Sequence, residues 1–122
     1  FSEYFNQSEF QKVSGNATTF VQYNFSLSRK WVLRGLHFQK EPYSQSKLVS
    51  VSLGKILDVA VDIRKDSENY GKYFSYVLSS DKHESLFIPK GFAHGYLTLS
   101  ESAIINYLIL KINLIKFINK YF

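Results

Sequence analysis

The feature that most limits the fold of this chain is a period of two in its hydropathy over residues 47–64. A first run, residues 47–53, ends at Gly54-Lys55, and a second run covers residues 57–64. Since side chains alternate between the two faces of a strand, the pattern predicts two antiparallel strands joined by a short turn. The expected inward face of the first strand is Lys47, Val49, Val51 and Leu53. On the second we expect apolar residues inside and polar residues outside, namely Leu57, Val59, Val61 and Ile63 against Asp58, Ala60, Asp62 and Arg64.

Other short strands are expected along the rest of the chain. Strand-like segments cover residues 18–26, 30–39, 72–78, 86–88 and 92–99, with polar turns between them. Such regular spacing predicts an all-β sandwich or barrel. The length of 122 residues suits one domain with one core. Residues 3–12 fit either a short helix or a loop.

The segment 103–122 differs from the rest of the chain. It is built from few residue types, and its apolar positions fit neither a strand period nor a helix period throughout. Lys and Asn interrupt it too often for a membrane-spanning helix, which needs about 20 mostly apolar residues. Three interpretations stay open: a helix that covers the barrel, an edge strand that pairs with another chain, or residues outside the ancestral fold.

The composition removes several classes of site. The chain has no Cys, which excludes a disulfide framework, a thiolate zinc site and a cysteine nucleophile. No two of the three histidines are two or four positions apart, so we expect no metal. The net charge of +5 suits a phosphorylated ligand, but the basic residues form no cluster, so we expect no nucleic acid and no membrane as partner. The expected location is cytoplasmic.

The first candidate site residue is His37, in the segment Leu-Arg-Gly-Leu-His-Phe-Gln of residues 33–39. Such a histidine can titrate near neutral pH and move a proton, although a lone histidine on an apolar strand is more often a core residue. Arg34 favours the functional interpretation, because arginine is almost never fully buried without a partner. Arg34 and His37 have opposite parity, so a regular strand would send them to opposite faces. A bulge at Gly35 would re-aim one of them.

A second histidine, His94, follows a Pro-Lys-Gly turn in the segment Phe-Ala-His-Gly. Asp58 or Asp62 is a candidate to orient it. Lys47 lies on an expected inward face, where a buried charge would need a carboxylate or an anionic ligand; an exposed lysine at the strand start is the alternative. Together these residues predict a barrel cavity that binds an anionic ligand or moves protons on it.

Four segments in a fixed order, residues 33–39, 45–49, 58–65 and 88–96, resemble the dTDP-4-dehydrorhamnose 3,5-epimerase family. Residues 20–26 and 1–6 extend the similarity, which covers about residues 1–107. The resemblance implies an all-β, cupin-like antiparallel β-barrel or jelly roll that is incomplete at the C-terminus. It divides the chain into an epimerase core, residues 1–107, and an atypical apolar tail, residues 108–122. It also implies a homodimer formed by strand exchange, no cofactor or metal, and a nucleotide-sugar substrate of dTDP-rhamnose biosynthesis for cell-envelope polysaccharide.

The resemblance implies a role for each site residue. His37 would be the base that removes the protons at C3 and C5 of a nucleotide-linked 4-keto-6-deoxyhexose, and Lys47 would stabilise the enolate oxygen. The remaining expected substrate-binding residues are Arg34, Gln22 and Asn24 for sugar or diphosphate, His94 and Tyr107 for the pocket, and Glu3 and Phe1, partly across the dimer, for the nucleotide.

After Tyr107 the chain departs from the family pattern. The family continues with a tyrosine that acts as the acid on the opposite face of the sugar and a distant aspartate that pairs with the base. Asn113 falls about where that tyrosine is expected, and the aspartate has no counterpart. Losing an orienting carboxylate can cost a histidine base several orders of magnitude. We therefore expect a core truncated at both ends with impaired or absent activity; the alternatives are a non-catalytic cupin-type binding module and a nucleotide-sugar ketoisomerase.

Overall fold

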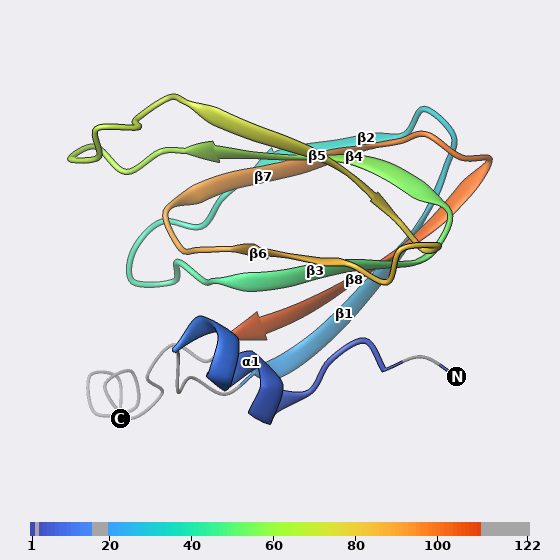
Figure 1. Cartoon of the computed structure of the whole chain (residues 1–122). Coiled ribbons are helices and arrows are strands. Elements are labelled where there is room, and N and C mark those ends of the chain that lie inside the picture. Colours follow the sequence, from blue (N-terminus) through green and yellow to red (C-terminus); the bar gives the residue numbers. More distant parts are fainter. Residues whose placement is uncertain (2, 16–19, 111–122) are drawn as a thin grey trace, which may run out of the picture.

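The computed structural model describes residues 1, 3–15 and 20–110. Two antiparallel sheets of four strands each face one another, with strand orders β1-β8-β3-β6 and β2-β7-β4-β5 (Figure 1). The elements are α1 (Gln7–Ser14), β1 (Phe20–Arg29), β2 (Leu33–His37), β3 (Lys47–Leu53), β4 (Lys55–Asp62), β5 (Tyr73–Ser79), β6 (Ser85–Ile88), β7 (Phe92–Thr98) and β8 (Ser102–Leu110). The all-β prediction is confirmed.

The strands β3 and β4 meet at Gly54 as predicted, but they do not pair with each other. β3 lies between β8 and β6, whereas β4 lies between β7 and β5 in the facing sheet. Gly54 has φ +79°, and a Cβ there would collide with the Ser102 carbonyl oxygen and with Ser100 Oγ. The chain therefore crosses from one sheet to the other at a tight corner, and Leu53 beside it is 45% exposed rather than inward.

The expected faces of β4 are wrong. Its buried residues are Ile56, Asp58, Ala60 and Asp62, while Leu57, Val59 and Val61 on the outer face are half-buried. The two aspartates tolerate this because each has a partner: Asp58 contacts His94, and Asp62 accepts hydrogen bonds from the loop that follows β4. Buried charge is tolerated when it is paired and hydrogen-bonded, so the interior of this sandwich is partly polar.

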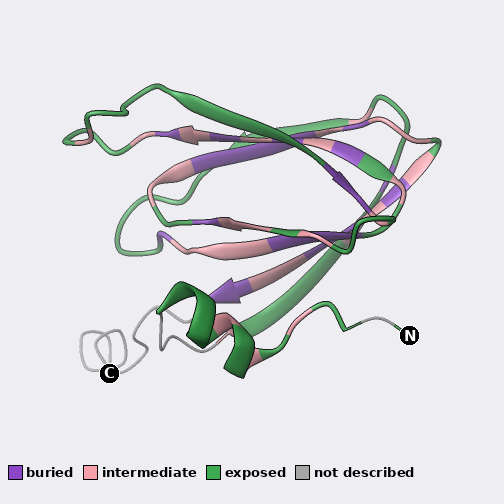
Figure 2. Cartoon of the chain, in the orientation of Figure 1, coloured by how far each residue is buried: buried purple, intermediate pink, exposed green. Residues whose placement is uncertain are grey.

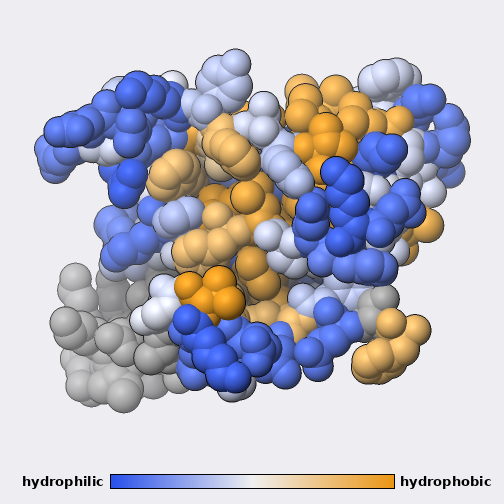
Figure 3. Space-filling model, in the orientation of Figure 1, coloured by the Kyte–Doolittle hydropathy of each residue, from blue (hydrophilic) through white to orange (hydrophobic). Residues whose placement is uncertain are grey.

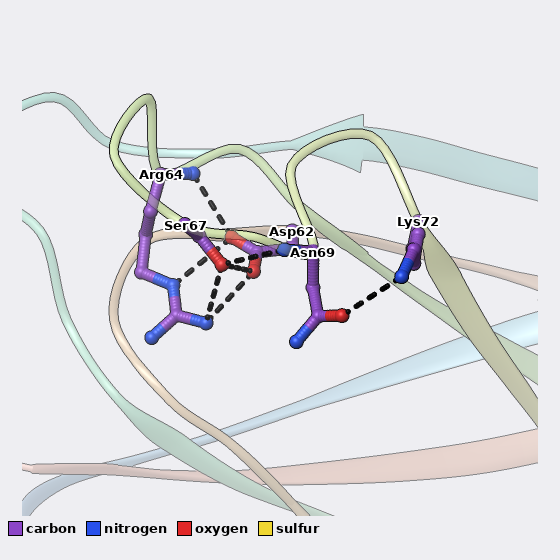
Figure 4. A network of polar contacts seen from close by, with 5 residues as sticks. All are labelled: Asp62, Arg64, Ser67, Asn69 and Lys72. Carbon is purple, nitrogen blue, oxygen red and sulfur yellow. Dashed lines mark hydrogen bonds and ion pairs between the residues drawn. The ribbon is translucent and has the colours of Figure 1, made fainter.

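The Asp62 network closes the loop between β4 and β5 (Figure 4). Arg64 donates from Nε to Oδ1 at 3.0 Å and from Nη2 to Oδ2 at 2.7 Å, and Ser67 Oγ donates to Oδ2 at 2.6 Å. The hydrogen bond from Arg64 is the main cause that holds the pKa of Asp62 well below its ordinary value of 3.8. In the same loop Lys72 Nζ donates to Asn69 Oδ1 at 3.1 Å.

Strand β1 has a polar inner face and an apolar outer face. Its register places Asn24, Ser26 and Ser28 opposite Tyr107, Ile105 and Ala103 of β8, and the latter two side chains are fully buried. The alternate residues Val21, Tyr23, Phe25 and Leu27 are between 53% and 67% exposed. This arrangement inverts the usual amphipathic pattern of a half-buried strand.

The segment left open at residues 3–12 contains a helix, α1. Asn6 caps it by accepting a hydrogen bond from the Glu9 amide at 3.1 Å, and Gly15 ends it with φ +65°. Phe10 packs edge-on against Phe20 and also contacts Phe87, which attaches the helix to the β1 sheet.

Residues 103–110 belong to β8, which lies between β1 and β3. For these residues none of the three interpretations left open by the sequence is correct, because they form a central strand. Residues 111–122 lie outside the described part of the chain.

The apolar core lies between the two sheets (Figure 2). Buried residues are concentrated in β3, β4, β7 and β8, whereas α1 contains none. Apolar side chains run through the middle of the face shown in Figure 3, and hydrophilic residues cover the loops at its edges. The core side chains are Val49, Val51, Ile56, Ala60, Leu78, Ile88, Tyr96, Ala103 and Ile105.

Candidate functional site

A pocket of about 360 Å³ opens at one end of the sandwich. Both sheets contribute to it, together with the segment between β2 and β3. Its lining residues are Gln22, Asn24, His37, Phe38, Gln39, Ser44, Gln45, Lys47, Ile63, Gly91, Phe92, Tyr107 and Ile109. A concave site with a few convergent polar groups is the usual form of a small-molecule site.

The bulge predicted at Gly35 is present and decides where His37 lies. β2 pairs with β7 through Arg34 opposite Tyr96 and His37 opposite His94, with a register shift between the two pairs. Directly opposite residues of an antiparallel pair share a face, so the extra residue in β2 brings Arg34 and His37 to the same, inner face. His37 then lines the pocket from the β2 sheet.

The backbone at the bulge allows no side chain. Gly35 has φ +100°, and a Cβ there would lie 2.6 Å from the His94 carbonyl oxygen and 2.7 Å from Gly95 Cα. A Cβ on Gly95 would in turn lie 2.6 Å from the Arg34 carbonyl oxygen. Both glycines are therefore needed for β2 and β7 to approach this closely beside His37.

Lys47 begins β3 and lines the pocket from the opposite sheet. Burial lowers the pKa of its ammonium group below the ordinary 10.5, and the charge of Asp58 acts against this by raising it. Lys47 is therefore a partly desolvated cation that faces the cavity with a carboxylate nearby, as its position on the inward face predicted.

His94 is buried and does not line the pocket among the described residues. Its Nε2 makes a short hydrogen bond with Asp58 Oδ1, so Asp58 rather than Asp62 orients this ring. Asp58 is fully buried, and its Oδ2 has no hydrogen-bond partner within the described part of the chain. The His94 ring also meets the Tyr107 ring edge-on, with centroids 6.4 Å apart. His94 thus supports the pocket from behind Tyr107.

Tyr107, on β8, lines the pocket and joins a set of buried and half-buried hydroxyl groups. Its Oη lies 3.4 Å from Ser26 Oγ, which lies 3.0 Å from Tyr96 Oη. Burial is the main cause that raises the pKa of Tyr107 well above its ordinary value of 10.0, so the phenol is protonated at neutral pH.

The other predicted residues fall into two groups. Gln22 and Asn24 line the pocket, and Gln22 Nε2 donates to Asn24 Oδ1 at 3.2 Å. Phe1 and Glu3 are exposed and outside the described lining. Arg34 is also outside it; its Nε donates to Ser28 Oγ at 3.1 Å. Position 113 lies outside the described residues, so the prediction for Asn113 stays a prediction.

The sequence interpretation did not identify two sets of site residues. Phe38, Gln39, Ser44 and Gln45 lie between β2 and β3 and show no period from which their placement could be predicted. The hydroxyl groups of Ser26, Ser28 and Tyr96 were also missed. An unbroken polar stripe at alternate positions 22, 24, 26 and 28 was the available signal.

Within residues 1, 3–15 and 20–110, no group of three or more His, Asp or Glu side chains is placed to hold a metal ion. Over the same residues, no helix has the length and apolar character to cross a membrane.

The comparisons with known proteins agree on one family. The family model described as dTDP-4-dehydrorhamnose 3,5-epimerase matches residues 1–113. The Escherichia coli (strain K12) protein named dTDP-4-dehydrorhamnose 3,5-epimerase is 52% identical over 107 residues, which are 88% of this chain and 58% of that protein. This chain therefore spans little more than half the length of that relative.

Solved structures show the same similarity. The dTDP-6-deoxy-D-glucose-3,5-epimerase of Legionella pneumophila Philadelphia 1, in complex with dTDP-4-keto-L-rhamnose, has a TM-score of 0.87 and 44% identity, over 92% of this chain and 59% of its own. A double mutant of ChmJ, a 3'-monoepimerase from Streptomyces bikiniensis in complex with dTDP, has a TM-score of 0.81 and 25% identity, over 88% of this chain and 54% of its own. In that mutant one histidine and one tyrosine are substituted. The predicted cupin-like jelly roll is confirmed.

Proposed function

Because this chain belongs to the dTDP-4-dehydrorhamnose 3,5-epimerase family, we propose that it binds a nucleotide-linked 4-keto-6-deoxyhexose and inverts C3 and C5 by removing and returning protons. One observation carries the proposal: His37 enters the pocket from the β2 sheet, while Lys47 and Tyr107 enter it from the facing sheet. A sugar held between the sheets would have a base on one side and a cation and a proton donor on the other.

His37 and Lys47 supply the groups that the first half of such a reaction needs. The keto group at C4 acidifies the neighbouring C–H bonds by taking charge onto its oxygen, and His37 removes the proton. The ammonium group of Lys47 stabilises the enolate oxygen, and its partial desolvation strengthens that interaction.

We propose Tyr107 as the group that returns a proton to carbon. It lines the pocket from the sheet opposite His37 and is protonated at neutral pH. The histidine and tyrosine substituted in the ChmJ double mutant have the same separation along that chain as His37 and Tyr107 have along this one. The tyrosine that the resemblance implied then corresponds to position 107 rather than 113.

The pocket also offers groups for the nucleotide part of the substrate. The side-chain amides of Gln22 and Asn24 face the cavity and suit hydroxyl and phosphate oxygens. Arg34 uses Nε for Ser28, and its terminal nitrogens have a geometry that suits a diphosphate. We assign His94 a supporting position behind Tyr107 rather than contact with the sugar.

We also propose a homodimer. The outer face of β1 exposes Val21, Tyr23, Phe25 and Leu27, an apolar stripe that a second copy would remove from water. Phe1 and Glu3 then have a role at the pocket of the partner copy. Light scattering after gel filtration tests this: the wild-type chain should run as a dimer and Phe25→Glu as a monomer, and a monomeric wild type would contradict it.

A non-catalytic binding module is the second candidate, and a specific observation favours it. Among the described residues no carboxylate is hydrogen-bonded to the His37 ring, so none of these residues provides the orienting partner that a histidine base normally uses. Such a chain would bind nucleotide sugar and exchange protons slowly or not at all.

One experiment separates the two candidates. The chain is incubated with dTDP-4-keto-6-deoxyglucose in deuterated water, and NMR follows deuterium at C3 and C5, while calorimetry measures binding. Exchange that depends on His37 supports the epimerase. Binding without exchange supports the binding module, and the absence of both contradicts the proposed function.

A further inference from the structure

Four hydroxyl groups form a continuous chain from the pocket to Arg34. Tyr107 Oη lies 3.4 Å from Ser26 Oγ, Ser26 Oγ lies 3.0 Å from Tyr96 Oη, and Tyr96 Oη lies 2.8 Å from Ser28 Oγ. Arg34 Nε ends the chain by donating to Ser28 Oγ at 3.1 Å. The hydrogen-bonded groups come from β1 and β8 of one sheet and from β2 and β7 of the other, so they bridge the two sheets.

The direction of every hydrogen bond in this chain follows from its last member. A guanidinium group can only donate, whereas a hydroxyl carries one hydrogen and also accepts. Ser28 accepts from Arg34, and its remaining contact within the described residues is Tyr96, so Ser28 donates to Tyr96. By the same argument Tyr96 donates to Ser26, and Ser26 donates to Tyr107.

The reverse direction would be unfavourable, because Ser28 and Tyr96 are buried, with exposed fractions of 3% and 2%. If Tyr96 donated to Ser28, the Ser28 hydrogen would have no acceptor among the described residues. A buried donor without an acceptor costs about 1–3 kcal/mol. Arg34 therefore sets the direction of every hydrogen bond in this chain of hydroxyl groups.

We propose that Arg34 and the hydroxyls of Ser28, Tyr96 and Ser26 are positioning residues that turn the Tyr107 hydrogen into the pocket. The proposal rests on the proposed function, in which Tyr107 returns the proton. Since the Tyr107 oxygen accepts from Ser26, its own hydrogen is free for the substrate carbon.

The proton balance of the step is simple. The O–H bond of Tyr107 breaks, a C–H bond forms on the sugar, and the electron pair stays on the phenolic oxygen. That anion keeps the Ser26 hydrogen bond, at the end of a chain whose other end is the Arg34 cation. Water in the open pocket then returns a proton to Tyr107.

Tyr96→Phe is the sharpest test, because it removes one oxygen from the middle of the chain and keeps the aromatic ring in the core. Tyr76→Phe is the control: Tyr76, on β5, donates to Glu84 Oε2 at 2.8 Å, outside the chain of hydroxyl groups and away from the pocket lining. Unfolding curves of both variants confirm that the fold is kept. Ser28→Ala, with Ser28→Thr as the variant that restores the hydroxyl, provides a second pair if Tyr96→Phe fails to fold.

Two readouts are used. In the exchange assay Tyr96→Phe should lower kcat by roughly ten-fold to a hundred-fold, since a positioned acid contributes about 10²–10⁴-fold, and should leave KM within about two-fold. Tyr76→Phe should change neither kcat nor KM. An active wild type with an unchanged kcat in Tyr96→Phe would overturn the proposal.

The second readout needs no turnover. A fluorinated tyrosine at position 107 is titrated by fluorine NMR in each background. The pKa of Tyr107 should fall in Tyr96→Phe, because the Tyr96 hydroxyl is one of the groups that raise it, and should not move in Tyr76→Phe. No exchange by the wild type together with this fall in pKa would contradict the proposed function alone, whereas an unchanged titration would overturn the hydroxyl-chain proposal itself.

Discussion

Arg34 and His37 point to the same side of their sheet although they stand three positions apart on one strand. In a regular strand two such residues lie on opposite faces, whereas the bulge at Gly35 brings them to the same face. The consequence is that one strand supplies both His37, the proposed base in the pocket, and the cation that ends the chain of hydroxyl groups.

Gly35→Ala should unfold at a lower denaturant concentration than the wild-type chain. The new Cβ would lie 2.6 Å from the His94 carbonyl oxygen, at a residue with φ +100°. Overpacking and backbone strain together predict a loss of about 3 kcal/mol. Gly71→Ala is the control, because Gly71 has φ +78° but nothing within 4 Å of a Cβ, so it should lose only about 1 kcal/mol. Equal losses would show that the contact between β2 and β7 is unimportant.

His37→Gln should lower deuterium incorporation at C3 and C5 by about 10²–10⁴-fold, the range for removal of a general base. Binding of dTDP, measured by calorimetry, should stay within a few-fold. His83→Asn is the control, since His83 is exposed in a turn with φ +54°, a conformation that Asn adopts readily. Full exchange in the His37 variant would refute its role as the base.

Lys47→Met should lower exchange by about 10²-fold, as expected for loss of one group that stabilises an oxyanion, and should raise the melting temperature at neutral pH. Burial lowers the pKa of Lys47 below 10.5, so the folded chain holds this proton less tightly than the unfolded chain. The stabilising contribution of the lysine is complete above pH 10.5 and is lost as the pH falls through the folded pKa. Melting curves at several pH values should show that the difference in melting temperature between Lys47→Met and the wild-type chain shrinks toward pH 10.5. A difference that grows with pH would contradict the predicted direction of the pKa shift.

Asp62→Asn should lower the melting temperature at neutral pH. In this variant the melting temperature should also fall less steeply as the pH is lowered. Hydrogen bonds from Arg64 are the main cause that holds the folded pKa of Asp62 below 3.8. Its contribution is therefore complete above pH 3.8 and is lost as the pH falls through the folded pKa. Asp66→Asn, an exposed change in the same loop, is the control and should keep the wild-type profile. If the melting temperatures of the two variants depend on pH in the same way, Asp62 does not contribute to the acid sensitivity of the fold.

Much of the fold could be predicted from local pattern. The turn at Gly54, the strands of residues 73–98 and the bulge at Gly35 all depend on residues close together in the sequence, and each is present. The resemblance also named the residues that the structure brings together at the pocket, His37, Lys47 and Tyr107.

The faces of β1 and β4 could not be predicted from hydropathy. The rule that apolar residues face inward assumes a uniformly apolar interior, and this interior holds Asp58, Asp62 and the hydroxyls of Ser26 and Ser28. Two of these residues have partners far away in the sequence: Asp58 is 36 residues from His94, and Ser28 is 68 residues from Tyr96. Only the pairing of strands shows that Asp58 and Ser28 meet these partners.

The contact between Gly35 and Gly95 has a consequence for how such a pocket can change over generations. Because backbone meets backbone there, the place of His37 is set by main-chain atoms rather than by the size of any neighbouring side chain. Pocket-wall residues such as Phe38, Gln45 and Phe92 can then differ in size without moving His37. The shape of the pocket wall and the place of His37 are therefore set by different parts of the structure.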